Sequence, residues 1–123
     1  PGKRPLSSMS STIVARDGKP WLAAGASGGP RIITGTLRLL TAVIDSGLDV
    51  GEAMDVPRIH HQWSPDILRV EKGVSRETVR CLELQGHDVE LESGESAVQA
   101  VLAGPDGFRA VSDPRKGGTA AAY

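Results

Sequence analysis

Two consecutive glycines, Gly28 and Gly29, stand directly before a proline and a long periodic apolar run. Glycine permits positive φ and lets a ligand approach the backbone closely. If the run is a helix, the backbone N–H groups of this glycine pair lie at its positive end, which is the geometry of an oxyanion hole or an anion site. Pro30 has no N–H, so the donors have to be those of Gly28 and Gly29. From the residues alone, a plain structural turn is the other interpretation.

A second polar element, Leu6-Ser7-Ser8-Met9, carries two adjacent hydroxyls that can donate hydrogen bonds to a carboxylate, although an ordinary polar turn has the same composition. This element precedes one expected strand, over residues 12–15, and the loop of residues 25–29 follows the returning strand, over residues 21–24. A hairpin brings its two ends to the same edge. We therefore expect Ser7 and Ser8 to lie near the glycine pair, within reach of one ligand.

The glycine loop also fits the pattern G-x-S-x-G, with Ser27 at the position of a nucleophile elbow between a strand and a helix. Acids and bases that such a nucleophile could use follow it, namely Asp45, Asp66, His60 and His61. However, only one hairpin precedes Ser27, whereas an α/β-hydrolase needs several strands before its elbow. We expect Ser27 to be a loop residue and not a nucleophile.

The histidine pair predicts no metal site. Adjacent residues on an extended segment point in opposite directions, so His60 and His61 cannot easily bind one ion. No Cys or Glu accompanies them at ligand spacing, and we expect structural hydrogen bonding beside Trp63 and no cofactor. Cys81 is the single cysteine, which excludes an internal disulfide, and we expect it to be a buried small hydrophobe within a helix.

Composition narrows the class of protein. In 123 residues, 14 Lys and Arg nearly balance 15 Asp and Glu, so no overall field favours nucleic acid or an anionic membrane surface. No apolar run is long enough to span a membrane. Aromatic residues are only 3%, so the core has to be aliphatic, and we expect it to be completed against another polypeptide. The first residue is Pro1, not Met, which indicates a processed, truncated or partial chain.

Local patterns predict an α+β layered domain in which βαβ crossovers do not dominate. Asp17-Gly18 is a hairpin turn signal, and Ser75 can cap a helix. Residues 58–65 read as irregular. Strands are expected over residues 12–15, 21–24, 68–70, 88–91, 97–103, 108–111 and 120–123, and helices over residues 32–46, 51–55 and 75–84.

Five segments together resemble one family. They are Lys3-Arg4-Pro5-Leu6-Ser7-Ser8-Met9-Ser10, the glycine pair before Arg31-Ile32-Ile33, Pro57-Arg58-Ile59-His60-His61-Gln62-Trp63, Gly104-Pro105-Asp106-Gly107 and Ser112-Asp113-Pro114-Arg115. In order and spacing they resemble the small subunit of γ-glutamyltransferases (γ-glutamyltranspeptidase, glutathione hydrolase). The resemblance runs over essentially the whole chain. It implies that residues 1–123 are a single partial domain, the C-terminal portion of the small, catalytic subunit.

The resemblance implies an N-terminal-nucleophile hydrolase with an αββα four-layer sandwich, completed by other chain segments. In this family a precursor cleaves itself, and the new N-terminal Thr of the small subunit attacks a γ-glutamyl amide such as glutathione. A free α-amino group can serve as its base. The acyl-enzyme then passes the γ-glutamyl group to water or to an amino acid or peptide. By resemblance, Gly28 and Gly29 form the oxyanion hole, while Ser7 and Ser8 hold the substrate α-carboxylate.

The catalytic Thr has no counterpart in this chain. The expected partners are therefore the large subunit and the Thr-bearing part of the small subunit, with a periplasmic or secreted location by resemblance. Two alternatives stay open from the residues: a glutaryl or cephalosporin acylase of the same superfamily, and a non-catalytic binding module that has lost the Thr.

Overall fold

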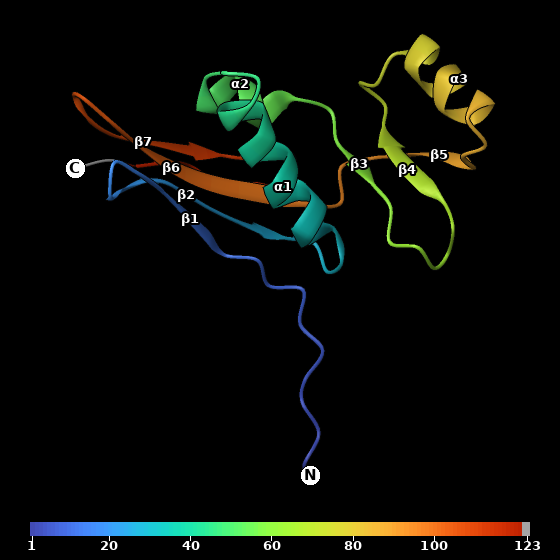
Figure 1. Ribbon diagram of the computed structural model, residues 1–123, viewed down its shortest axis with the longest axis horizontal. Coiled ribbons are helices and arrows are strands. Elements are labelled where there is room, and N and C mark those ends of the chain that lie inside the picture. Colours follow the sequence, from blue (N-terminus) through green and yellow to red (C-terminus); the bar gives the residue numbers. More distant parts are fainter. Residues whose placement is uncertain (122–123) are drawn as a thin grey trace.

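The computed structural model describes residues 1–121 as two β-sheets with helices against them (Figure 1). The elements in chain order are β1 (Thr12–Arg16), β2 (Lys19–Ser27), α1 (Arg31–Ile44), α2 (Val50–Asp55), β3 (Ile59–His60), β4 (Leu68–Glu71), α3 (Arg76–Leu84), β5 (Val89–Glu92), β6 (Ala97–Gly104) and β7 (Gly107–Ser112). Helices α1 and α2 lie on one face of the larger sheet, and α3 lies beside the smaller one. The expected α+β class is confirmed.

The larger sheet has the strand order β1-β2-β6-β7, and every neighbouring pair is antiparallel. The turn between β1 and β2 places both Asp17 and Gly18 at positive φ, 51° and 74°, which is the conformation that a two-residue hairpin turn of this composition prefers. A second hairpin joins β6 to β7 through a turn at Pro105 and Asp106, and Gly107, at φ 121°, begins β7. Two local turns thus flank one long-range pairing, that of β2 with β6.

The core lies between this sheet and the two helices that cover it. Leu22 and Val98 come from the two central strands and pack against Leu39 of α1 and Met54 of α2, all four fully buried. Alanines such as Ala42 fill the rest of the interface. The fully buried side chains of this core are aliphatic, as the composition predicted, and the half-buried Trp21 packs against them.

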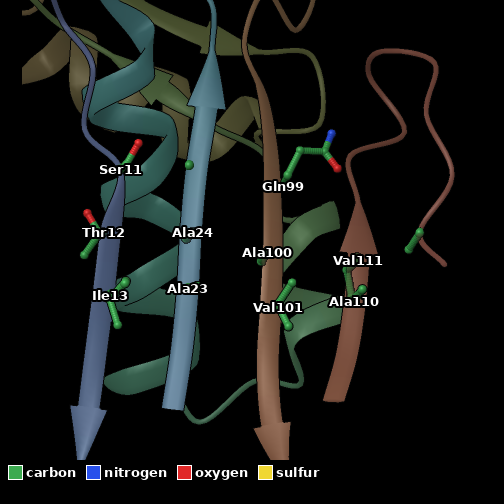
Figure 2. Close-up of a pocket in the computed structure, with 12 residues that line it drawn as sticks. Ser11, Thr12, Ile13, Ala23, Ala24, Gln99, Ala100, Val101, Ala110 and Val111 are labelled. Carbon is green, nitrogen blue, oxygen red and sulfur yellow. The ribbon is translucent and has the colours of Figure 1, made fainter. Parts of the chain in front are cut away.

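The opposite face of the larger sheet is not covered by any helix within residues 1–121. Figure 2 shows side chains of all four strands on this face, with the helices behind the sheet. Ile13 is 71% exposed and Val101 is 40% exposed. Together with neighbours such as Ala23 and Ala110 they line a shallow, mainly apolar hollow of about 440 Å³.

The smaller sheet has the order β3-β4-β5. β4 and β5 are parallel and are joined through α3, so this part of the chain is a βαβ unit, which the local patterns did not reveal. Ser75 caps α3 by accepting a hydrogen bond from the Thr78 N–H at 3.0 Å, as expected. No residue of α3 is buried, and the expectation for Cys81 is therefore wrong: its thiol is exposed.

Two further expectations need correction. The segment of residues 58–65 is not wholly irregular, because Ile59 and His60 pair with β4 as the short strand β3. Ala120 and Ala121 form no strand, and the remainder of that expected strand, residues 122–123, lies outside the described residues. In the described part of the chain, none of the helices has the length and apolarity needed to cross a membrane.

Candidate functional site

The glycine pair lies between the end of β2 and the start of α1. β2 pairs with β6, and Ser27 stands opposite Ala97. The glycine pair therefore emerges beside the two residues that precede β6, Glu95 and Ser96. The central strand pairing of the larger sheet thus determines where the glycine N–H groups lie.

Gly28 and Gly29 adopt backbone conformations that other residues rarely adopt, with φ at 131° and 59°. A Cβ at position 28 would lie 2.8 Å from the Glu95 carbonyl oxygen and 2.8 Å from the Ser96 Cα, which is closer than real Cβ contacts. Position 28 therefore requires glycine for space as well as for conformation. A Cβ at position 29 would meet nothing within 4 Å, so only the backbone conformation favours glycine there.

The carbonyl groups of the glycine pair are used by the helix, and the N–H groups are not. The Gly28 carbonyl accepts a hydrogen bond from the Arg31 N–H at 3.2 Å, and the Gly29 carbonyl accepts one from the Ile32 N–H at 3.1 Å. Throughout residues 1–121, neither glycine N–H donates to a protein acceptor. Both donors are therefore free to bind an anionic oxygen.

Helix α1 begins without a side-chain cap. Its N-cap residue is Pro30, and no acidic residue lies in its first turn. The partial positive charge of the helix start is therefore not neutralised by the helix's own side chains in that turn. An oxyanion bound at the glycine pair would be stabilised by this charge in addition to the two hydrogen bonds.

Ser7 and Ser8 lie in the segment before β1, which extends away from both sheets (Figure 1). The hairpin does bring this segment to the same end of the sheet as the glycine loop, since Thr12 pairs with Ala24. The Ser7 Oγ accepts a hydrogen bond from the Met9 N–H at 3.2 Å, and the other side-chain bonds of this segment are equally local. Among residues 1–121, no hydrogen bond joins either serine to the glycine pair.

Ser27 has no histidine or carboxylate at its hydroxyl among the described residues. Its Oγ accepts a hydrogen bond from the Lys116 Nζ at 3.1 Å, and both residues are exposed. The histidines that an elbow would need are engaged elsewhere. The expectation that Ser27 lies in a loop is wrong, because β2 runs to Ser27, which pairs with Ala97 of β6. Its surroundings agree with the expectation that it is not a nucleophile.

His60 and His61 turn to different partners. The buried His60 ring bonds to the Thr34 hydroxyl and to the Gln62 side chain, each at 3.0 Å. The His61 Nε2 lies 2.9 Å from Asp66, and its Nδ1 accepts the Trp63 N–H at 3.2 Å. The expected structural hydrogen bonding beside Trp63 is confirmed. Across residues 1–121, no three His, Cys, Asp or Glu side chains gather into a metal-binding group.

A buried ionic network behind the glycine pair was missed from the sequence. Arg58 pairs with Asp113 at 2.6 Å, and the two side chains are 7% and 0% exposed. Arg115 pairs with Glu71 at 2.6 Å and with Asp113 at 3.2 Å. Arg58 also donates to the Ser96 carbonyl at 2.9 Å. The network therefore ties the C-terminal segment to the residues that adjoin the glycine pair.

The network changes the ionisation of its buried carboxylate. Burial by itself raises the pKa of Asp113, but hydrogen bonds from the Val98 and Arg115 N–H groups and from the Arg58 side chain outweigh it, and the net pKa is lowered. Burial likewise lowers the pKa of Arg115, and the hydrogen bond and charge of Glu71 more than compensate. Both groups are therefore charged at neutral pH.

The chain is similar to known proteins over its whole length. The family model described as Gamma-glutamyltranspeptidase matches residues 1–123. The glutathione hydrolase proenzyme of Escherichia coli (strain K12) is 53% identical over 116 residues, which are 94% of this chain and 20% of that relative. The chain thus spans about a fifth of the length of the curated relatives that it matches.

Solved structures agree with this chain in fold. A mutant of the Helicobacter pylori gamma-glutamyltranspeptidase is similar with a TM-score of 0.86 and 42% identity, covering 94% of this chain and 64% of that chain. The Pseudomonas nitroreducens gamma-glutamyltranspeptidase complexed with L-DON is similar with a TM-score of 0.91 and 33% identity, covering 100% of this chain and 66% of that one.

A shared arrangement of strands and helices over nearly the entire chain defines the class: the protein has the α+β fold of an N-terminal-nucleophile hydrolase. Within that class, the chain belongs to the gamma-glutamyltranspeptidase family.

Proposed function

We propose that residues 1–123 are the C-terminal portion of the small subunit of an enzyme that cleaves γ-glutamyl amides such as glutathione. The γ-glutamyl group would pass through an acyl-enzyme to water or to an amino acid or peptide acceptor. The observation that carries the proposal is the glycine pair, with two free N–H donors at an uncapped helix start.

The chemistry divides between this chain and the rest of the protein. An N-terminal Thr in the preceding part of the small subunit attacks the amide carbonyl, and its own α-amino group takes the hydroxyl proton. The resulting tetrahedral oxyanion is held by the N–H groups of Gly28 and Gly29. Collapse expels the amine, which leaves with that proton, and an ester joins the γ-glutamyl group to the Thr. Water or an acceptor amine then attacks this ester through the same oxyanion site.

Ser7 and Ser8 are proposed to bind the α-carboxylate of the γ-glutamyl group. Their hydroxyls are both suited to donate to a carboxylate, and the segment that carries them ends where β1 pairs with β2, at the glycine end of the sheet. For both serines to reach a ligand at the glycine pair, the segment has to fold against the rest of the enzyme. The large subunit and the Thr-bearing part of the small subunit are the proposed partners.

We further propose that the enzyme is made as a self-cleaving precursor and acts in the periplasm or outside the cell. The relatives named as proenzymes support the first point, and the family resemblance supports the second.

The test compares γ-glutamyl and glutaryl anilides as substrates of the complete protein, because the two differ only in the α-amino group. We expect the γ-glutamyl compound to be the better substrate. Ser7→Ala and Ser8→Ala should each lower kcat/KM for it by about tenfold or more, the scale of losing a hydrogen bond to a charged group. Thr12→Ser, which keeps a hydroxyl on β1, is the matched control and should change little.

Faster turnover of the glutaryl anilide would identify a glutaryl or cephalosporin acylase instead. Turnover of neither compound, together with the absence of a Thr-initiated polypeptide by intact mass, would identify a non-catalytic binding module. Serine variants that match the control would overturn the carboxylate assignment alone.

A further inference from the structure

We propose that Arg31 is a positioning residue, which holds the glycine pair in its oxyanion-binding geometry by pairing with Glu92 and Glu95. The inference rests on the proposed function and deepens it. It assigns to the first residue of α1, and to two glutamates more than sixty residues away, a role in the reaction that their chemical types alone do not suggest.

The pairing has the geometry of a fork. The Arg31 Nε donates to the two Glu92 oxygens at 3.2 and 3.1 Å, and its Nη2 donates to Oε2 at 2.8 Å. The remaining nitrogen, Nη1, lies 3.0 Å from Glu95 Oε2. The side chains of Arg31 and Glu92 are only 18% and 15% exposed. A bidentate pair that is shielded in this way fixes direction as well as distance.

Arg31, Glu92 and Glu95 are linked to one another, and both Arg31 and Glu95 contact the backbone of Gly28. The backbone N–H of Arg31 donates to the Gly28 carbonyl, while its side chain holds Glu92 and Glu95. The Glu95 backbone carbonyl then returns to Gly28, within 2.8 Å of where a Cβ would stand. A shift of the connection between β5 and β6 would therefore move the Gly28 peptide. Arg31 opposes such a shift because its backbone binds Gly28 while its side chain binds the two glutamates.

The pairing also neutralises charges that would otherwise be unfavourable near the start of α1. A cation in the first turn of a helix is disfavoured by the helix dipole, so Arg31 is a poor choice for helix stability alone. Without it, the carboxylates of Glu92 and Glu95 would lie close to the site where an oxyanion forms and would repel it. The hydrogen bond to Glu92 raises the pKa of Arg31 and outweighs the effect of burial, so the guanidinium stays charged.

The test is Arg31→Lys in the complete enzyme. Lysine retains the charge and loses the fork, so it separates positioning from simple neutralisation. We expect kcat for a γ-glutamyl anilide to fall about tenfold, because small misplacements of reacting groups have effects of this order. KM should stay within about twofold, since Arg31 acts on the oxyanion donors and the proposed α-carboxylate site is at Ser7 and Ser8.

Arg109→Lys is the matched control. Arg109 also pairs with a carboxylate at a helix start, that of Asp49 before α2. The two pairs are separated by the whole of α1, about 20 Å for its 14 residues. We expect the control to keep its kcat, although both variants lower the thermal midpoint. A kcat for Arg31→Lys equal to that of the control would overturn the inference.

Glu95→Gln carries the same test if Arg31→Lys does not fold, because Glu95 is the more exposed partner and its loss leaves the Glu92 fork intact. We expect a decrease of about threefold in kcat with KM unchanged, and an unchanged kcat would overturn the inference. Failure of the wild-type enzyme to turn over any γ-glutamyl compound would instead overturn the proposed function, and the positioning role with it.

Discussion

At the scale of single residues, Gly28 and Gly29 are not equivalent. Alanine at position 28 would have to displace the Glu95 and Ser96 backbone, whereas alanine at position 29 enters open space. The difference follows from the antiparallel pairing of β2 with β6, which brings one backbone against the other at position 28 only. We therefore expect substitutions of Gly28 and Gly29 to have different effects, although the two glycines are adjacent in the sequence.

Gly28→Ala also keeps its N–H, but its Cβ would clash with the Glu95 and Ser96 backbone and move the peptide. We therefore expect it to lower kcat of the complete enzyme by about 10²-fold, the scale of losing one oxyanion donor. Gly29→Ala retains its N–H and adds only the strain of a left-handed alanine, about 1–2 kcal/mol, so its effect should be smaller. Steady-state kinetics with a γ-glutamyl anilide measures both. Equal losses in the two variants would mean that the contact with Glu95 does not control the site.

Sequence reasoning could find the glycine pair because its signal is local: two glycines and a proline before a helical period. It could not find the partners that hold the pair. Glu92 lies 61 positions after Arg31, and no periodicity connects residues so far apart. The Arg58 and Asp113 pair escaped notice for the same reason, although both residues stand in segments that resemble the family.

At the scale of elements, the buried pair of Arg58 and Asp113 joins the start of β3 to the segment that follows β7. Removal of one member leaves an unpaired charge in a buried place. We expect Asp113→Ala to lower the free energy of unfolding by about 3–5 kcal/mol, and Asp113→Asn by less, because the amide still accepts a hydrogen bond. Urea unfolding of the complete protein measures this. An exposed pair, Asp49 with Arg109, is the comparison and should contribute less than 1 kcal/mol.

The same carboxylate predicts a pH dependence. The folded-state pKa of Asp113 is lowered from its ordinary value of 3.8, so its contribution to stability is complete above that pH and is lost as the pH falls through the lower, folded value. The difference in urea midpoint between wild type and Asp113→Asn should therefore be constant from pH 7 to about 5 and shrink below about 4. A difference that grows on acidification would contradict the assigned sign.

The elements that could be predicted are those with a local cause. The hairpin at Asp17-Gly18, the apolar period of α1 and the Ser75 cap each act within a few residues. β3 was missed because two residues carry no period, and its pairing with β4 is what makes it a strand. Cys81 was misplaced because an apolar period predicts a face of a helix and does not say whether anything covers it.

At the scale of the whole molecule, the uncovered face of the larger sheet is the main departure from a self-sufficient domain. The α+β class follows from element order. The low aromatic content predicted that another polypeptide completes the core, but it did not indicate which face that polypeptide covers. In the proposed four-layer sandwich, other chain segments cover Ile13 and Val101.

We expect Val101→Asp to lower the thermal midpoint of the complete protein by several degrees, since a carboxylate would be buried against the second layer. Val101→Thr is the matched control, because it has nearly the same shape and no charge, and its effect should be much smaller. Differential scanning calorimetry of both variants decides. An unchanged midpoint for Val101→Asp would mean that this face stays in contact with water in the assembled enzyme.

The short connection between β5 and β6 has a consequence for how the chain tolerates changes of length. Residues 93–96 run from the end of one sheet to the start of a central strand of the other, and they pass Arg31 and Gly28 on the way. One residue added there would have one of two effects. It would shift the register of β6 against β2, which turns Val98 from the core to the outer face, or it would displace the Glu95 backbone from Gly28. An addition in the hairpin between β6 and β7 would disturb neither. The first connection therefore behaves as a spacer of set length, while the second is a place where insertions can be accommodated.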